Sequence, residues 1–125
     1  MLEAMKRIDA AGPNGTLLNL RGLNLGRLPN DLALKLPQLR NLDLAGNNLT
    51  EVSDIITKLP NLRVLNLARN NLASVSTFQP LGMLDQLSDL DLTGNPLNET
   101  AFIQHYKGRQ AVLGFLESLD GFLKK

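Results

Sequence analysis

One pattern of hydrophobic and polar positions recurs along the chain. It reads L-x-x-L-x-L-x-x-N-x-L, and three full copies begin at Leu39, Leu62 and Leu87. A weaker copy begins at Leu17 and carries Leu23 in the asparagine position. The full copies follow one another at 23 and then 25 residues. This period indicates a stack of small units, each of which buries its apolar face against its neighbours.

The first half of each copy predicts a short strand. In the segment x-L-x-L the leucines alternate with a period of two, so they share one face of the strand. The leucines expected to point into the core are Leu42, Leu44, Leu65, Leu67, Leu90 and Leu92. The asparagine that follows lies where the chain leaves the strand, and its amide can donate to and accept from backbone groups there. We therefore expect Asn47, Asn70 and Asn95 to form a buried, structural ladder.

The second half of each repeat predicts a short helical turn on the convex side of the stack. In the second repeat the apolar residues are spaced as on one helix face. These residues are Leu49, Val52, Ile55, Ile56 and Leu59. Pro37 and Pro60 are expected to end the turn before the next strand. The longer third return is predicted to bury Phe78, Leu81 and Leu84.

The amino-terminal end departs from the repeat and is predicted to be a helical cap. Residues 2–11 are amphipathic, with Leu2, Met5 and Ile8 on one apolar stripe. The glycines and proline of residues 12–15 are expected to break this helix.

The carboxyl-terminal end is also predicted to be a helical cap. Asn98 or Thr100 is a suitable first residue, and Gly108 and Gly114 are expected to interrupt the helical pattern. The residues expected to cover the last strand are Phe102, Tyr106, Val112, Phe115, Leu116, Leu119 and Phe122. The sequence therefore predicts one domain. Its parts are a cap (1–14), repeats (15–38, 39–61, 62–86 and 87–97) and a second cap (98–125).

The recurring pattern resembles the leucine-rich repeat family, in register over eleven positions. The resemblance implies an α/β repeat fold, a short right-handed horseshoe-shaped solenoid with parallel strands on its concave face and helical caps at both ends. Extracellular members close their ends with disulfides, whereas this sequence has no cysteine and is similar to intracellular members. The function implied is protein binding without catalysis.

The carboxyl-terminal half resembles the branch of this family that has a cap without cysteine. The resemblance is carried by the segments KLPNL, VSTFQPL, Asn95-Pro96-Leu97, His105-Tyr106 and Val112 to Leu119. It is strongest to the acidic leucine-rich nuclear phosphoproteins. The spliceosomal small nuclear ribonucleoprotein A-prime and the dynein leucine-rich light chain share the architecture. In this branch the His-Tyr pair belongs to a helix, which implies that His105 is a packing residue.

These relatives imply several classes of partner. They are a phosphatase, a histone or nuclear complex, an RNA-binding protein and a cytoskeletal motor. We therefore expect a binding module for a phosphatase or a nuclear or chromatin regulator. The alternative is a structural adaptor of a cytoskeletal or ribonucleoprotein complex. The histone handling of the acidic phosphoproteins depends on a long Asp/Glu tail, so that activity is not carried over.

Composition limits the kinds of binding and metal site that the chain can form. The chain has 125 residues, a net charge of +1, no cysteine and one histidine. The balance of charge gives no reason to expect bulk binding to nucleic acid or to an anionic membrane. Thiolate and multi-histidine metal sites are excluded, and no cofactor or metal is predicted. The first residues lack the order of a signal peptide and no apolar run approaches the length of a membrane span, so we expect the cytoplasm or the nucleus.

Residues that alternate with the core leucines are expected to face the concave side, where equivalent positions of adjacent repeats lie about 4.8 Å apart. The candidate partner-binding residues are Leu17, Asn19, Arg21, Arg40, Asn41, Asp43, Arg63, Val64, Asn66, Arg69, Asp89 and Asp91. Arginines lie on the early repeats and aspartates on the last one, so the map favours a docked protein segment that carries both charges. Four strands span roughly 15 Å, which is wide enough for one helix. The alternative is a solvated face whose charges serve solubility.

Two other functions, catalysis and nucleic-acid binding, are less well supported by the sequence. Asp43 and Asp91 would lie roughly 10 Å apart on one face, but no insertion builds a pocket around them and no phosphate-binding loop is present, so catalysis is not expected. The four candidate arginines could form a nucleic-acid patch, but the neighbouring aspartates and the lack of exposed aromatic residues argue against it.

Self-association through the first strand is a further alternative. Leu17 and Leu23 lie near the edge of the weak first repeat, and an exposed edge strand can pair with another copy. The helix at 2–11 is expected to block this edge, so a monomer is predicted.

Overall fold

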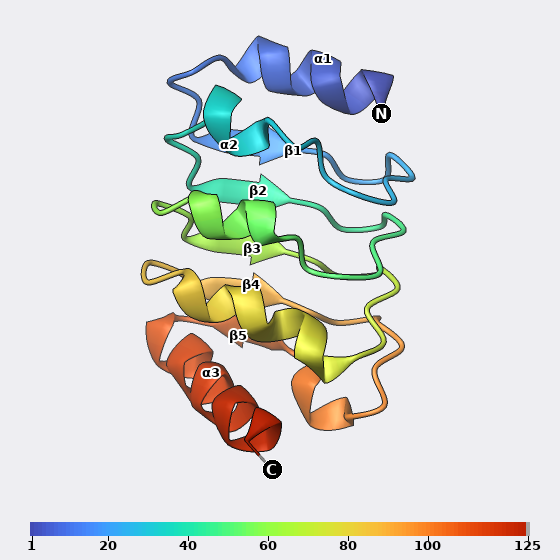
Figure 1. Cartoon of the computed structure of the whole chain (residues 1–125), viewed down its shortest axis with the longest axis vertical. Coiled ribbons are helices and arrows are strands. Elements are labelled where there is room, and N and C mark those ends of the chain that lie inside the picture. The colour runs from blue at the N-terminus through green and yellow to red at the C-terminus, as the bar shows by residue number, and fades with distance from the viewer. Residues whose placement is uncertain (125) are drawn as a thin grey trace.

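The computed structural model describes residues 1–124, and successive turns of the chain stack along its long axis with the two termini at opposite ends (Figure 1). The α-helices are α1 (Leu2–Ala11), α2 (Leu32–Lys35) and α3 (Arg109–Leu123). The 3-10 helices are η1 (Asp54–Lys58), η2 (Val75–Met83) and η3 (Thr100–Phe102). The strands are β1 (Leu17–Asn19), β2 (Asn41–Asp43), β3 (Val64–Asn66), β4 (Asp89–Asp91) and β5 (His105–Lys107).

The strands form one sheet in chain order, from β1 to β5. The first four are parallel, and β5 runs antiparallel to β4. Their register aligns the middle residues of β1 to β4, and these leucines are at most 2% exposed. The row is Leu18, Leu42, Leu65 and Leu90. The predicted strands and their inward leucines are therefore confirmed, and β1 in the weak first copy follows the same pattern.

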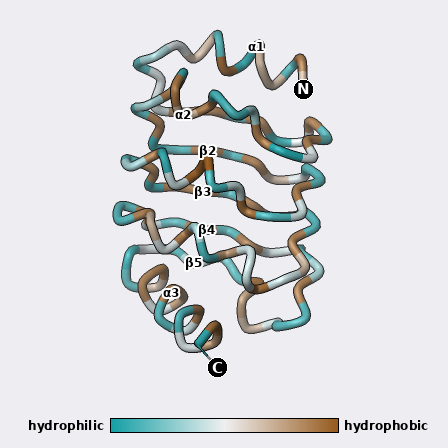
Figure 2. The backbone as a smooth tube through the Cα atoms, viewed as in Figure 1, coloured by the Kyte–Doolittle hydropathy of each residue, from teal (hydrophilic) through white to brown (hydrophobic). Residues whose placement is uncertain are grey.

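The helical returns form a second layer, because parallel neighbours can be joined only by a crossover connection. The segments α1, α2, η1, η2 and α3 contact one another in that order. Hydrophobic stretches recur in successive turns (Figure 2). The predicted turn in the second repeat is η1, in which Ile56 is buried and Ile55 is half-buried. Phe78, Leu81 and Leu84 are buried as predicted.

The repeat asparagines connect one turn to the next. The Asn70 amide accepts a hydrogen bond from the Leu49 N–H at 3.0 Å and donates to the carbonyls of Leu44 and Leu67. Asn95 repeats this arrangement one turn later. Asn47 accepts from the backbone N–H groups of two residues in the first repeat. Asn70 and Asn95 are each 5% exposed, whereas Asn47 is only half-buried.

Helix α1 lies where it was predicted, but the predicted buried stripe is wrong. Its core-facing residues are Ala4 and Ile8, whereas Leu2 is 69% and Met5 42% exposed. The small Ala4 lets the helix pack closely on β1. The helix also covers the edge of that strand, since the Arg7 guanidinium donates to the Asn19 carbonyl at 3.0 Å.

A salt bridge holds α1 to α2. The Lys35 ammonium lies 3.1 Å from the Asp9 carboxylate and 3.6 Å from that of Asp31. Its hydrogen bond to Asp9 and the charge of Asp31 raise the pKa of Lys35 above its ordinary value.

The carboxyl-terminal segment corrects two expectations. His105 and Tyr106 were expected in a helix but belong to strand β5, and Gly114 lies inside α3 without interrupting it. A helix would leave the backbone groups of β4 unpaired along one edge, whereas β5 pairs with them. The pairing continues just beyond the two strands, where the Gly108 N–H donates to the Ser88 carbonyl at 2.7 Å. Only η3 forms at the predicted helix start.

Aromatic side chains pack against the last strands. Phe102 and Phe115 are buried, and their ring centroids are 5.9 Å apart. Tyr106 points from β5 toward Phe115, with a centroid distance of 4.7 Å, and its hydroxyl donates to the Ala101 carbonyl. Burial raises the pKa of Tyr106 above its ordinary value. These three rings lie against the last strands, and Tyr106 contributes from a strand and not from a helix.

Candidate functional site

The sheet register aligns the candidate residues in rows on the side of the strands opposite the core. One row begins with Leu17 and ends with Asp89, and a second begins with Asn19 and ends with Asp91. Strand β5 extends both rows, with Lys107 opposite Asp89. We call this surface the strand face. Its residues are Leu17, Asn19, Arg21, Arg40, Asn41, Asp43, Arg63, Val64, Asn66, Arg69, Asp89, Asp91, His105 and Lys107.

The second row has a structural role that the repeat pattern alone does not reveal. In each strand its side-chain oxygen accepts a hydrogen bond from the backbone N–H two residues later, at 2.9 to 3.1 Å. The four residues are Asn19, Asp43, Asn66 and Asp91. Such side chains close the bend at the end of a strand. One oxygen of each is therefore engaged within the chain, and their polarity has a structural cause apart from any partner.

Asp43 is also paired across a turn of the stack. Arg21 donates from Nε to its second carboxylate oxygen at 3.0 Å. The Arg21 side chain is 45% exposed and that of Asp43 is 23% exposed. Two of the candidate residues thus satisfy each other in the free protein.

The aspartates of β4 are held by His105. Its Nε2 lies 2.7 Å from Asp89, and its Nδ1 lies 3.5 Å from Asp91. The Thr93 hydroxyl also donates to Asp91, at 2.7 Å. His105 is therefore not the packing residue that was expected, because its ring lies on the strand face. The alternation of His105, Tyr106 and Lys107 with a period of two was the available signal.

Four cations of the strand face, unlike the residues just described, are not paired with another side chain of the described residues. Within the part of the chain that the structure describes, their side chains make no hydrogen bond or ion pair, and all are exposed. They are Arg40, Arg63, Arg69 and Lys107. Arg40 and Arg63 lie at the start of neighbouring strands, where the Arg63 N–H donates to the Arg40 carbonyl at 2.8 Å. The repeat pattern does not reveal Lys107, because β5 does not belong to the repeat.

Arg69 stands in a backbone conformation that favours glycine. Its φ is 54°, and the equivalent positions of the other repeats are glycines with φ between 68° and 76°. Those residues are Gly22, Gly46 and Gly94. Arg69 packs over Gly94, since a β-carbon there would lie 3.0 Å from Arg69 Cγ. A side chain in the left-handed region is strained, and among the four repeats only this one projects a side chain from that position.

The apolar candidates differ from each other in their exposure to solvent. Leu17 is 63% exposed, while Val64 is half-buried between its neighbours in the row. Asn41 lies between them in register, and its side chain makes no hydrogen bond to a described residue.

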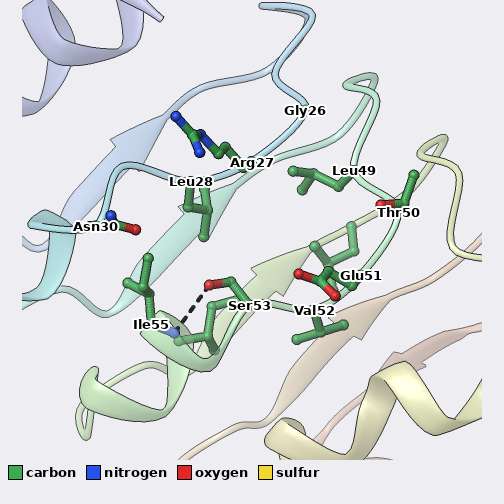
Figure 3. Close-up of a pocket in the computed structure, with 12 residues that line it drawn as sticks. Gly26, Arg27, Leu28, Asn30, Leu49, Thr50, Glu51, Val52, Ser53 and Ile55 are labelled. Carbon is green, nitrogen blue, oxygen red and sulfur yellow. Dashed lines mark hydrogen bonds between the residues drawn. The ribbon is translucent and has the colours of Figure 1, made fainter.

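A pocket of about 170 Å³ lies between the returns of the first two repeats, away from the strand face (Figure 3). Leu28 and Val52 line it together with Arg27 and Glu51, and Ser53 accepts a hydrogen bond from the Ile55 N–H beside it. Glu51 is its one carboxylate among the described lining residues, so this lining offers no acid–base pair. Within residues 1–124, no group of three or more His, Asp or Glu is placed to hold a metal ion.

The strands, returns and asparagine ladder define a repeat protein of stacked strand–helix units. The leucine rich repeat family matches residues 13–72 and, in an overlapping frame, residues 37–97. The chain therefore belongs to the leucine-rich repeat family, whose domains generally mediate protein–protein interactions. No curated protein matches the chain. None of the helices described is long and apolar enough to cross a membrane.

Proposed function

We propose that this chain is a non-catalytic protein-binding module that docks its partner on the strand face. The observation that carries the proposal is the alignment of exposed, unpaired side chains on a fixed backbone ladder. Arg40, Arg63 and Asn41 are free to contact a partner, and Leu17 adds exposed apolar surface. Arginines and exposed apolar residues are enriched at the centres of protein interfaces. The other strand-face residues are part of the same proposed surface.

The proposal includes the architecture around this surface. The strand face is taken as the concave side of a short horseshoe-shaped solenoid, with α1 and residues 98–124 as its caps and the whole chain as one domain. Because α1 packs on β1 and Arg7 donates to the Asn19 carbonyl, the edge that could pair with a second copy is covered. We therefore propose a monomer that acts in the cytoplasm or the nucleus and does not bind nucleic acid.

The resemblance to the acidic leucine-rich nuclear phosphoproteins supplies the partner classes of the proposal. They are a phosphatase, or a nuclear or chromatin regulator. An adaptor role in a cytoskeletal or ribonucleoprotein complex is the alternative, and the identity of the captured partner decides between them.

The test blocks the strand face without changing its charge. Asn41→Trp places a bulky side chain in the middle of the strand face, and Leu34→Trp places the same group on α2, where Leu34 is 84% exposed. Tagged proteins are purified from the cells that produce the chain, and captured proteins are identified by mass spectrometry. We expect a partner that wild type and Leu34→Trp retain and Asn41→Trp loses. Equal capture by all three proteins would place the function elsewhere.

A further inference from the structure

We infer that the strand face recognises an acidic helical segment of its partner protein through a basic row, which consists of Arg40, Arg63 and Lys107. This inference rests on the proposed function, since it names the chemistry of the segment that docks there. It also departs from the map based on sequence alone, which favoured a segment carrying both charges.

Backbone hydrogen bonds place Arg40 and Arg63 of the basic row on one line across the strands. The Arg40 N–H donates to the Thr16 carbonyl and the Arg63 N–H to the Arg40 carbonyl, each at 2.8 Å. The line continues through Ser88 to Gly108, and Lys107 lies one residue off it, opposite Asp89. Neighbouring strands lie about 4.8 Å apart, so Arg40 and Arg63 are one strand apart and Lys107 lies about 10 Å further along.

The carboxylates of the strand face are already engaged within the chain. Asp43 accepts from Arg21 and from a backbone N–H, and Asp91 accepts from the backbone N–H and hydroxyl of Thr93. Asp89 lies 2.7 Å from His105 Nε2 and makes no ion pair with Lys107, although Lys107 is directly opposite it. A basic group on a partner would compete with these contacts.

The cations, in contrast, have free donors. An arginine side chain offers five N–H donors and a lysine three, and those of the basic row have no partner among the described residues. The strand face carries five Arg or Lys side chains against three aspartates, whereas the whole chain has a net charge of only +1. Its uncompensated charge is therefore positive and concentrated, and an anionic acceptor complements it.

The spacing of the basic row fits carboxylates on one side of a helix. An α-helix rises 1.5 Å per residue, so positions i, i+3 and i+10 lie about 4.5 and 15 Å along the axis and face the same side. Those spacings match one strand and three strands of the sheet. Nucleic acid fits less well, because single strands are held by stacking on aromatic side chains. The one aromatic residue among the five strands, Tyr106, points toward Phe115 on the core side.

The test uses a labelled alanine-based helical peptide of about 20 residues with glutamates at positions i, i+3 and i+10, and a second peptide with glutamines there. Binding is measured by fluorescence anisotropy at low and physiological salt. Arg40→Gln/Arg63→Gln removes two cations of the basic row. Arg27→Gln/Lys58→Gln is the matched control, because both side chains are exposed, unpaired among the described residues and located on the returns. The two double variants have the same net charge.

We expect the glutamate peptide to bind wild type and the control double variant equally, within about twofold. Arg40→Gln/Arg63→Gln should weaken this binding about tenfold, and the glutamine peptide should bind no protein measurably. Equal weakening in both double variants, or equal binding of both peptides, would overturn the inference. Tighter binding of a single-stranded oligonucleotide through the same arginines would replace the acidic helix with nucleic acid. Circular dichroism of each variant confirms that it is folded.

The two proposals fail separately. If the peptide does not bind but Asn41→Trp still loses a cellular partner that Leu34→Trp retains, the strand face is the docking surface and its preference for acidic segments is wrong. If the peptide binds through Arg40 and Arg63 but Asn41→Trp retains every cellular partner, the basic row is an acidic-peptide site and docking of the cellular partner lies elsewhere.

Discussion

The side-chain oxygen of Asn70 accepts a hydrogen bond of 3.0 Å from the backbone N–H of Leu49, one turn earlier in the stack. Asn70 also donates to the carbonyls of Leu44 and Leu67, so one amide joins two adjacent repeats. Because the side chain is only 5% exposed, water cannot easily replace these bonds. The stacking of the repeats therefore depends on an amide at this position.

Asn70→Ala is expected to destabilise the fold by about 3 kcal/mol, since it leaves the buried Leu49 N–H without its acceptor and removes one of the donors to the carbonyls of Leu44 and Leu67. The measurement is the free energy of unfolding from urea denaturation followed by circular dichroism. Asn71→Ala is the neighbouring control, because Asn71 is exposed, and it should change stability by less than about 0.5 kcal/mol. A loss below about 1 kcal/mol for Asn70→Ala would contradict this role.

Arg69→Gly is expected to stabilise the fold by about 0.5 kcal/mol. The gain arises because glycine adopts the left-handed conformation without the steric cost that arginine bears, partly offset by the greater freedom of glycine in the unfolded chain. Gly46→Ala provides the reverse change. A β-carbon at Gly46 has ordinary contacts, the nearest at 3.8 Å, so its cost of about 1 kcal/mol is conformational. Thermal unfolding of both variants measures this difference, and a destabilised Arg69→Gly would show that the arginine packing outweighs its strain.

The repeat determined what could be predicted from the sequence. Leu42, Leu65 and Leu90 hold the same position in successive repeats. The period of two within one strand, repeated in each copy, was therefore enough to place all three in the core. The asparagine positions followed from the same register, because an amide side chain can satisfy the backbone groups where the chain leaves a strand. Neither inference required knowledge of distant contacts.

The two ends of the chain lie outside the repeats, so no second copy of the pattern indicates their structure. In α1 the stripe of Leu2, Met5 and Ile8 fits a helix as well as the observed face of Ala4 and Ile8, and hydropathy favours the larger residues. Close approach to β1 instead selects the small side chain. Strand β5 has three residues, too few to establish a period, and it forms because β4 offers a free edge. The contact of His105 with Asp89 depends on that pairing and could not be read from sequence.

Tyr106 predicts a loss of stability at high pH. Its half-buried phenol has a raised pKa, so the folded state keeps the proton at pH values where the unfolded chain begins to lose it, near 10. The stabilising contribution is complete below the unfolded pKa and is lost as pH rises through the folded pKa. Unfolding free energies at about pH 9 and pH 11 should therefore fall more for wild type than for Tyr106→Phe.

The comparison with Tyr106→Phe is needed because Lys35 acts in the same direction. Its raised pKa also makes the folded state bind its proton more tightly than the unfolded chain, so stability falls as that proton is lost. Lys35 is present in both proteins, and only the difference between them reports on Tyr106. Identical pH profiles for wild type and Tyr106→Phe would show that the phenol ionises as freely in the fold as in the unfolded chain.

His105 is expected to act as a positioning residue for the basic row. Because the Asp89 carboxylate lies 2.7 Å from His105 Nε2, it is held away from Lys107, its opposite neighbour on β5. His105→Ala releases Asp89 to pair with Lys107, which removes one free cation. Binding of the glutamate peptide should weaken about threefold, as expected for one exposed ion pair.

His105→Gln retains an N–H donor for Asp89 and should bind the glutamate peptide as wild type does. In His105→Ala/Asp89→Asn, the neutral amide cannot form the ion pair, so the affinity should return to at least the wild-type value. If His105→Ala binds the peptide as tightly as wild type, Lys107 is free for a reason other than His105.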